Sequence, residues 1–279
     1  MVLTRRLFAT LALIALVYGC ATSPLGRRQL LLFPESDMAV MGAQAFDQMK
    51  KQVPLSQSAA TNDYVSCVAR AITAALDGAG SQRAWEVLVF EDDSANAFAL
   101  PGSKIGVHTG LLEVAVDQSQ LATVIGHEVA HVLSRHSNER VSTGTAAQLG
   151  MVAVQEALSA NTSSAATQQA MALLGLGAQV GILLPYSRAQ ESEADIVGLD
   201  LMARAGFDPQ ASIQLWRNMA RHAKKKQSKA GGSGGPPPEF MSTHPSHGTR
   251  IADLEARVPE SRKLYEAARA AGRRPCCSS

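Results

Sequence analysis

The chain has 279 residues, of which 46% are hydrophobic and 5% aromatic, and its net charge is +2. This length allows one or two domains with a sizeable core. The small net charge argues against a nucleic-acid-binding protein and against a strongly basic membrane protein. Because alanine is abundant and aromatic residues are few, we expect a mostly helical protein.

The first 19 residues have the pattern of a signal peptide. Arg5 and Arg6 form a short basic region, and the apolar stretch from residue 7 to residue 17 is too short to span a membrane as a helix. The sequence Val17-Tyr18-Gly19-Cys20 that follows resembles a bacterial lipobox. It predicts cleavage before Cys20 and acylation of the Cys20 thiol. The alternative is an ordinary signal peptide with a chance cysteine.

An acylated Cys20 would begin the mature protein with a lipidated linker over residues 20–34. We therefore expect a protein anchored by lipid to a bacterial cell envelope and facing the periplasm. Ala21 is not the aspartate that favours retention at the inner membrane. The outer membrane is therefore the first expectation.

A small sheet is expected between two groups of helices. The pattern of residues 35–78 predicts two helices. Residues 85–91 alternate as a strand does, and residues 98–100 and 105–107 predict two more short strands around a turn at Pro101-Gly102. We expect an antiparallel sheet here, with an edge strand available to bind a substrate backbone by β-addition.

The next helix carries a His-Glu-x-x-His motif at residues 127–131. Residues four apart lie on one face of a helix, so His127 and His131 can bind one zinc ion. Glu128 then projects beside the metal, where a general base for hydrolysis must sit. Asp117 is a suitable N-cap, with Gln120 completing a capping-box-like start. The alternative is two surface histidines with an incidental glutamate.

A hydrolytic zinc site needs a third protein ligand. The spacings of a third ligand in known zinc proteases do not match this sequence near the motif. For the metzincin extension, His136 lies one residue away from the required position. The acidic helix that begins near Ser187 places Glu191 and Asp195 on one face. Glu191 would complete a His₂Glu site, and Asp195 would hold the far nitrogen of a ligand histidine. Glu156 and Glu193 are the other candidate ligands, and a solvated acidic helix start is the alternative.

The segments after the metal helix have several interpretations. Residues 145–184 are rich in Ala, Gly and Leu and predict either a membrane insertion or a pair of helices that covers the core or the cleft. Residues 224–240 predict a flexible loop. His244, in Thr243-His244-Pro245, would stabilise an oxyanion, act as a fourth zinc ligand in a resting enzyme, or cap the following helix. Arg250 is a second candidate for binding an oxyanion or a substrate carboxylate.

The remaining cysteines do not define a disulfide framework. Cys67 lies in an apolar helical pattern and is expected to be a buried thiol. Cys276 and Cys277 lie in a polar tail.

Taken in order, these motifs resemble peptidase family M48, the gluzincin metalloproteases related to HtpX, the CAAX prenyl proteases and the Oma-type proteases. The soluble bacterial lipoprotein branch is the most similar. The resemblance rests on residues 96–102, 105–112, 127–131, 187–195 and 243–250, and it covers about residues 35–260. It implies a mostly helical α+β, zincin-type domain over residues 35–260, followed by a C-terminal tail over residues 261–279.

For the site, the resemblance implies one zinc ion bound by His127, His131 and Glu191, with Glu128 as the base and Asp195 as the acid behind the ligands. The expected function is a zinc-dependent endopeptidase that cleaves unfolded or misassembled envelope proteins. The alternative from another class is a periplasmic chaperone or assembly factor with a latent or structural zinc site. A plain binding module would leave Glu128 without a role.

Overall fold

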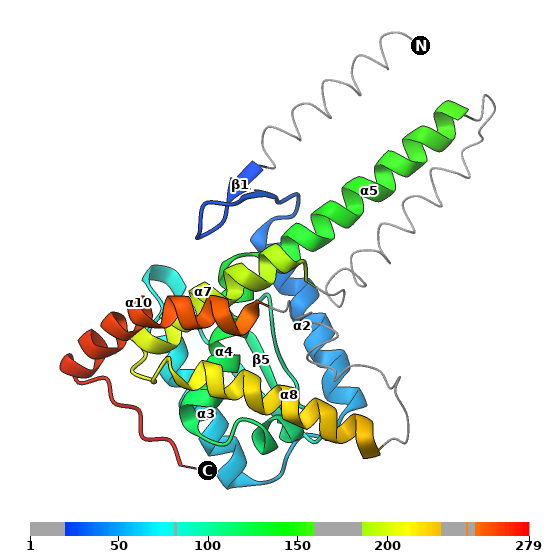
Figure 1. The fold of residues 1–279 in the computed structure, drawn as a ribbon. Helices are drawn as coiled ribbons and strands as arrows, with labels where there is room; N and C mark the ends of the chain where they lie inside the picture. The colour runs from blue at the N-terminus through cyan, green and yellow to red at the C-terminus, as the bar shows by residue number, and fades with distance from the viewer. Residues whose placement is uncertain (1–19, 81–82, 159–185, 230–243, 245–248, 279) are drawn as a thin grey trace.

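The computed structural model describes residues 20–80, 83–158, 186–229, 244 and 249–278 (Figure 1). The predicted signal peptide, the segment 159–185 and the Gly/Pro-rich part of the predicted loop lie outside these residues. In the described part of the chain, helices predominate and the only sheets have two and three strands. No helix of this part is both long and apolar enough to cross a membrane.

Two helices, α2 (Glu35–Gln52) and α3 (Ala59–Ala74), confirm the prediction for residues 35–78. Acidic residues in the first turn of α2 and lysines in its last turn match the helix dipole. Helix α3 begins at Ser58, whose hydroxyl accepts a hydrogen bond from the Thr61 amide. Helix α2 packs against Phe90 and Leu100 of the sheet, whereas α3 contributes its apolar face to the main core.

The three-stranded sheet has the order β3 (Glu86–Phe90), β5 (Lys104–His108), β4 (Ala97–Leu100). The strands lie where the sequence predicts them, but the sheet is mixed rather than wholly antiparallel, because β3 and β5 are parallel. The tight turn at residues 101–103 makes β4 and β5 a hairpin, in which Gly102 and Ser103 both have positive φ. Since β5 pairs with both other strands, β4 is left at an edge.

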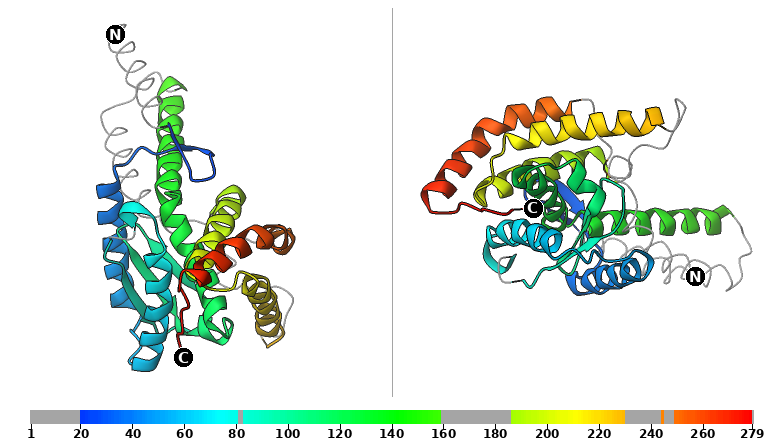
Figure 2. Two further views of the ribbon diagram at one scale, coloured as in Figure 1. Left: turned by 90° about the vertical axis from the view of Figure 1, so that its left-hand side faces the viewer. Right: turned by 90° about the horizontal axis from the view of Figure 1, so that it is seen from below.

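Helix α4 (Gln118–Leu133) carries the His-Glu-x-x-His motif through the centre of the molecule. Asp117 caps it as predicted, accepting hydrogen bonds from the Ser119 and Gln120 amides at 2.8 and 2.9 Å. Every residue from Gln120 to His131 is buried. Helices α2 and α3 lie on one side of α4, and α7, α8 and α10 lie on the other (Figure 2).

Three further helices complete the core: α7 (Arg188–Arg204), α8 (Ala211–Lys229) and α10 (Arg250–Ala270). Helix α7 begins after Ser187, as predicted, and Ser187 caps it in a capping box with Gln190. Helices α4 and α7 approach closely at two glycines. A Cβ atom on Gly198 would lie 2.7 Å from the backbone nitrogen of His127, and one on Gly126 would lie 2.9 Å from the backbone oxygen of Gly198.

Helix α5 (His136–Leu158) follows α4 almost at once and extends away from the rest of the molecule (Figure 1). The chain turns between the two helices at Arg135, which has a φ of 53°. This sharp connection places His136 directly behind the end of the motif.

Both ends of the described chain contain regular secondary structure. The predicted linker over residues 20–34 contains a hairpin of β1 (Cys20–Thr22) and β2 (Arg28–Leu30). Helix α10 runs across residue 260, where the end of the domain is predicted, and ends at Ala270. Cys67 is not a buried free thiol but forms a disulfide with Cys277, which fastens the tail to α3. Cys276 is free and exposed.

Candidate metal centre

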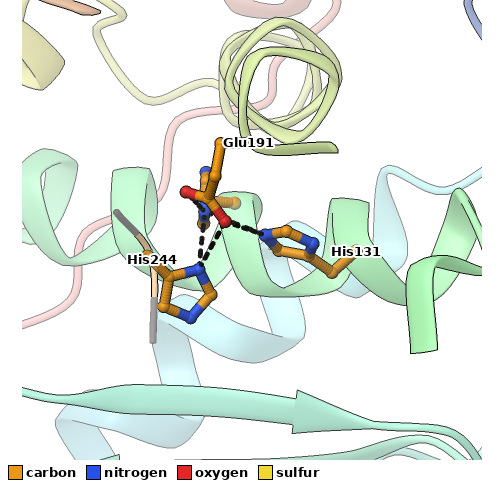
Figure 3. Close-up of side chains that lie close together, drawn as sticks. His131, Glu191 and His244 are labelled. Carbon is orange, nitrogen blue, oxygen red and sulfur yellow. Dashed lines mark hydrogen bonds and ion pairs between the residues drawn. The ribbon is translucent and has the colours of Figure 1, made fainter. Parts of the chain in front are cut away.

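Four buried side chains converge beneath α7. They are His127, His131, Glu191 and His244, and a ligand atom from each lies within 4.8 Å of the others. The Nε2 atoms of His127 and His131 are 3.0 Å apart. The Glu191 carboxylate, descending from α7, lies 3.4 Å from His131 Nε2 and 3.0 Å from His244 Nδ1 (Figure 3).

The Glu128 carboxylate lies at the edge of this cluster. It is 2% exposed, and its Oε1 is 3.4 Å from His244 Nε2 but accepts no hydrogen bond from any described residue. The backbone of Ala99 in strand β4 lies close to the carboxylate and slightly lowers its pKa. Burial raises the pKa of Glu128, and the nearby imidazoles offset this only in part. A buried carboxylate with a raised pKa is a suitable proton acceptor.

His127 is held from behind by the carboxylate of Asp195. Its Nδ1 lies 2.9 Å from Asp195 Oδ1, so the Nδ1–H donates to the carboxylate and Nε2 turns towards the cluster. Arg250 donates to the same Asp195 oxygen at 2.6 Å and to Glu191 Oε2 at 3.2 Å. The Arg250 guanidinium also stacks on the Trp216 ring, 3.7 Å from its centre.

His131 is held by a second histidine. Its Nδ1 lies 2.9 Å from Nδ1 of His136, whose Nε2 lies 3.1 Å from Oε2 of Glu193. Burial lowers the pKa of His136 to about 4, so the ring is neutral near pH 7. Tyr186 stacks on the His131 ring at 3.8 Å, and this contact fixes the plane of the imidazole.

The carboxylates of the cluster stabilise positive charge at its centre. Burial would lower the pKa of His127, but its hydrogen bonds to Asp195 and Glu191 outweigh this effect and raise the pKa to about 9. Burial would raise the pKa of Glu191, but hydrogen bonds from the histidines hold it far below the usual range. Two imidazoles and a carboxylate are ligands that zinc prefers. Together with the Glu128 oxygen that lacks a partner among described residues, they fit a catalytic zinc ion.

The structure brings most of the predicted site residues together, namely His127, Glu128, His131, Glu191, Asp195 and His244. Two others differ from expectation. Arg250 lies behind the ligands, bound to Glu191 and Asp195, and is therefore not positioned as an oxyanion donor. Glu193, an alternative ligand, contacts His136 instead. The side chain of Glu156 lies outside the described residues.

Sequence reasoning missed the roles of His136, Tyr186 and Trp216. The only signal for His136 was its position just after the motif, and the ligand spacings excluded it as a metal ligand. Tyr186 and Trp216 reach the centre only through the packing of α7, α8 and α10 around α4.

Comparison with known proteins decides the family. The model of peptidase family M48 matches residues 59–258, about seven-tenths of the chain. The chain belongs to peptidase family M48. It is 38% identical over 206 residues to the mitochondrial metalloendopeptidase OMA1 of Schizosaccharomyces pombe, covering 74% of this chain and 56% of that protein. Against the human OMA1 metalloendopeptidase the identity is 33%, covering 67% of this chain and 34% of that protein.

A bacterial relative matches over a similar length. The β-barrel assembly-enhancing protease of Escherichia coli is 26% identical over 226 residues, covering 80% of this chain and 44% of that protein. The chain thus spans about half or less of the length of these relatives. All of them are named as proteases or endopeptidases, in agreement with the site.

The same comparison corrects the expected location. The prediction of a periplasm-facing protein at a bacterial outer membrane is wrong by this test, because the relatives matched at 33–38% identity in yeasts, cattle and humans are mitochondrial metalloendopeptidases. The acylation of Cys20 stays a prediction, which mass spectrometry of the mature N-terminus tests.

Proposed function

We propose that the protein is a zinc-dependent endopeptidase. The observation that carries this proposal is the arrangement of Glu128 beside a buried His127, His131 and Glu191 cluster. Zinc, when bound, supplies a Lewis acid that activates water and polarises a carbonyl. The three ligands would hold the ion, with Asp195 and Arg250 fixing the orientation of His127 and Glu191.

Glu128 would carry the proton in this reaction. Its carboxylate would accept the proton of the attacking water and then pass it to the leaving amine. Two features of the site favour this role: burial raises the pKa of Glu128, and its Oε1 accepts no hydrogen bond from a described residue.

The edge strand β4 would bind the substrate backbone. The His108 backbone amide donates a hydrogen bond to the Asn96 backbone oxygen, and the backbone pairing of β4 with β5 alternates from there. The backbone N–H and C=O groups of Ala97 and Ala99 therefore point away from β5. The Ala99 backbone lies close to the Glu128 carboxylate, and no strand among the described residues covers this edge. An extended peptide added there would pass close to the base. Such binding favours unfolded or misassembled proteins as substrates, in keeping with a role in protein quality control.

The rival function is that of a chaperone or assembly factor whose metal site is latent. The position of His244 favours latency, because its Nδ1 lies 3.0 Å from Glu191 and 3.3 Å from His127 Nε2. As a fourth ligand, His244 would close the site at rest. His244→Ala should then raise basal proteolysis, including self-cleavage. If His244 instead acts as an oxyanion donor, the same change should lower the rate by roughly a hundredfold or more.

Glu128→Gln tests the activity itself. The amide keeps the shape of the side chain but cannot accept the proton. The variant should retain zinc and its thermal stability but lose cleavage of an unfolded protein substrate. Glu113→Gln removes an exposed carboxylate and serves as the control. Cleavage by Glu128→Gln at the parent rate, or an unchanged rate after chelation of zinc, would exclude the proposed mechanism.

A further inference from the structure

The metal ligand His131 is oriented by a chain of side chains that leaves the active site. An ionised carboxylate only accepts hydrogen bonds, so His136 must donate its Nε2–H to Glu193. As a zinc ligand, His131 keeps Nε2 free and carries its proton on Nδ1, so it donates this proton to Nδ1 of His136, 2.9 Å away. These two bonds fix the tautomer of His131 that presents a free Nε2 to the cluster.

Beyond Glu193, the chain reaches the N-terminal hairpin. Arg27 donates from Nε to Glu193 Oε2 at 3.1 Å, and the Leu25 amide donates to Glu193 Oε1 at 3.2 Å. Arg27 also forms a bidentate ion pair with Glu139 of α5. A segment about 100 residues before the motif therefore supplies the positive charge that holds Glu193.

The hairpin also holds the turn between α4 and α5. The side-chain nitrogen Nε2 of Gln29 donates hydrogen bonds to the Ser134 backbone oxygen at 2.7 Å and to Glu139 Oε2 at 3.0 Å. This turn contains Arg135 with its positive φ and leads directly into His136. The hairpin thus fixes both the backbone that carries His136 and the carboxylate that His136 bonds.

We infer that His136 is a positioning residue for His131, and that Glu193 and Arg27 make the zinc affinity of the site depend on docking of the N-terminal hairpin. This inference rests on the proposed function, in which His131 is a zinc ligand. The two ligand histidines then differ in their support. His127 is held by Asp195 from within the core, whereas His131 is held through a chain that ends in a surface hairpin.

Zinc affinity, measured by competition with a chromogenic chelator, tests each link. His136→Asn should weaken zinc binding by roughly ten- to a hundredfold, the usual effect of losing a partner of a ligand histidine. Arg27→Gln should give a smaller loss in the same direction. Arg28→Gln is the matched control, because Arg28 is the exposed neighbour of Arg27, and it should bind zinc as the parent does. The spectrum of the Co²⁺-loaded His136→Asn protein should change as well.

The double variant shows whether Arg27 acts through His136. If it does, Arg27→Gln should have little further effect on zinc affinity once His136 is replaced, whereas independent effects would multiply. Thermal unfolding of the metal-free proteins separates positioning from stability. A lower midpoint of the metal-free protein with unchanged zinc affinity would overturn the inference and leave the hairpin as a structural support.

Two further variants keep these outcomes distinct. Should His136→Asn fail to fold, Glu193→Gln breaks the same chain while preserving the shape of the side chain, and unchanged zinc affinity in that variant would overturn the inference. Glu191→Ala tests the proposed function underneath. If Glu191→Ala loses zinc while the His136 and Arg27 variants keep it, only the inference is wrong. If Glu191→Ala also keeps zinc, the proposed metal centre itself is wrong.

Discussion

The contact between Gly198 and the backbone of His127 makes a sharp prediction. A Cβ atom at position 198 would lie 2.7 Å from the backbone nitrogen of His127 and 2.8 Å from its Cα. Ordinary van der Waals contacts begin at 3.4 Å, so the shorter distance is about 0.7 Å too close. The obstacle is backbone in the middle of a buried helix, so α4 and α7 must separate. Gly198 lies two helical turns after Glu191 on the same helix, and the separation would carry Glu191 away from the histidines.

Gly198→Ala should therefore lower both stability and zinc affinity. Overpacking a tight interface costs about 1–3 kcal/mol, while alanine in a helix gains up to about 1 kcal/mol over glycine. The net loss of unfolding free energy should be at most about 3 kcal/mol. Metal ligands must lie within about 0.2 Å of ideal bond lengths, so zinc affinity should fall by roughly tenfold or more.

Chemical unfolding and chelator competition measure the two effects. Gly144→Ala is the matched control, because Gly144 is an exposed glycine of helix α5 with nothing within 4 Å of its Cβ position. It should be stabilised by up to about 1 kcal/mol, with unchanged zinc affinity. If Gly198→Ala behaved like Gly144→Ala, close packing of α4 on α7 would not be what positions Glu191.

Two other changes test the supports of the site and of the fold. Asp195→Asn should lower zinc affinity or turnover by roughly ten- to a hundredfold, because the amide accepts the His127 proton less strongly; zinc titration and cleavage assays measure this, and parent-like values would remove Asp195 from the site. Cys277→Ser should lower the unfolding free energy by roughly 2–5 kcal/mol under oxidising conditions. The control is Cys276→Ser, which removes the free, exposed neighbour, and equal stability of the two variants would show that the disulfide contributes nothing.

Local pattern determined much of this protein. Hydrophobic periodicity and the cap residue Asp117 predict α4, and the start signal at Ser187 predicts α7. The four-residue spacing of His127 and His131 predicts their convergence, because helix geometry alone puts them on one face. Glu191 and Asp195 were predictable for the same reason, once the small residues on α7 and α4 suggested that the two helices pack closely.

Other features depend on contacts between distant segments. The pairing of β3 with β5 is parallel because β4 is inserted between them in sequence and occupies the edge, an order that alternation cannot specify. Cys67 and Cys277 are 210 residues apart, so nothing local predicts their disulfide. Arg250 looked like a catalytic donor in sequence, but the packing of α10 on α7 buries its guanidinium between Trp216 and two carboxylates.

The proposed metal ligands thus follow from the sequence, whereas their supports follow from the tertiary structure. The α-helix has 3.6 residues per turn, so the sequence spacing alone shows that two ligands four residues apart share a face. The partners that set the tautomers come from wherever the fold brings a donor or acceptor within about 3 Å. For His127 that partner is Asp195, four residues from another ligand. For His131 it is a chain that ends at Arg27, and only the docked hairpin brings that charge to Glu193.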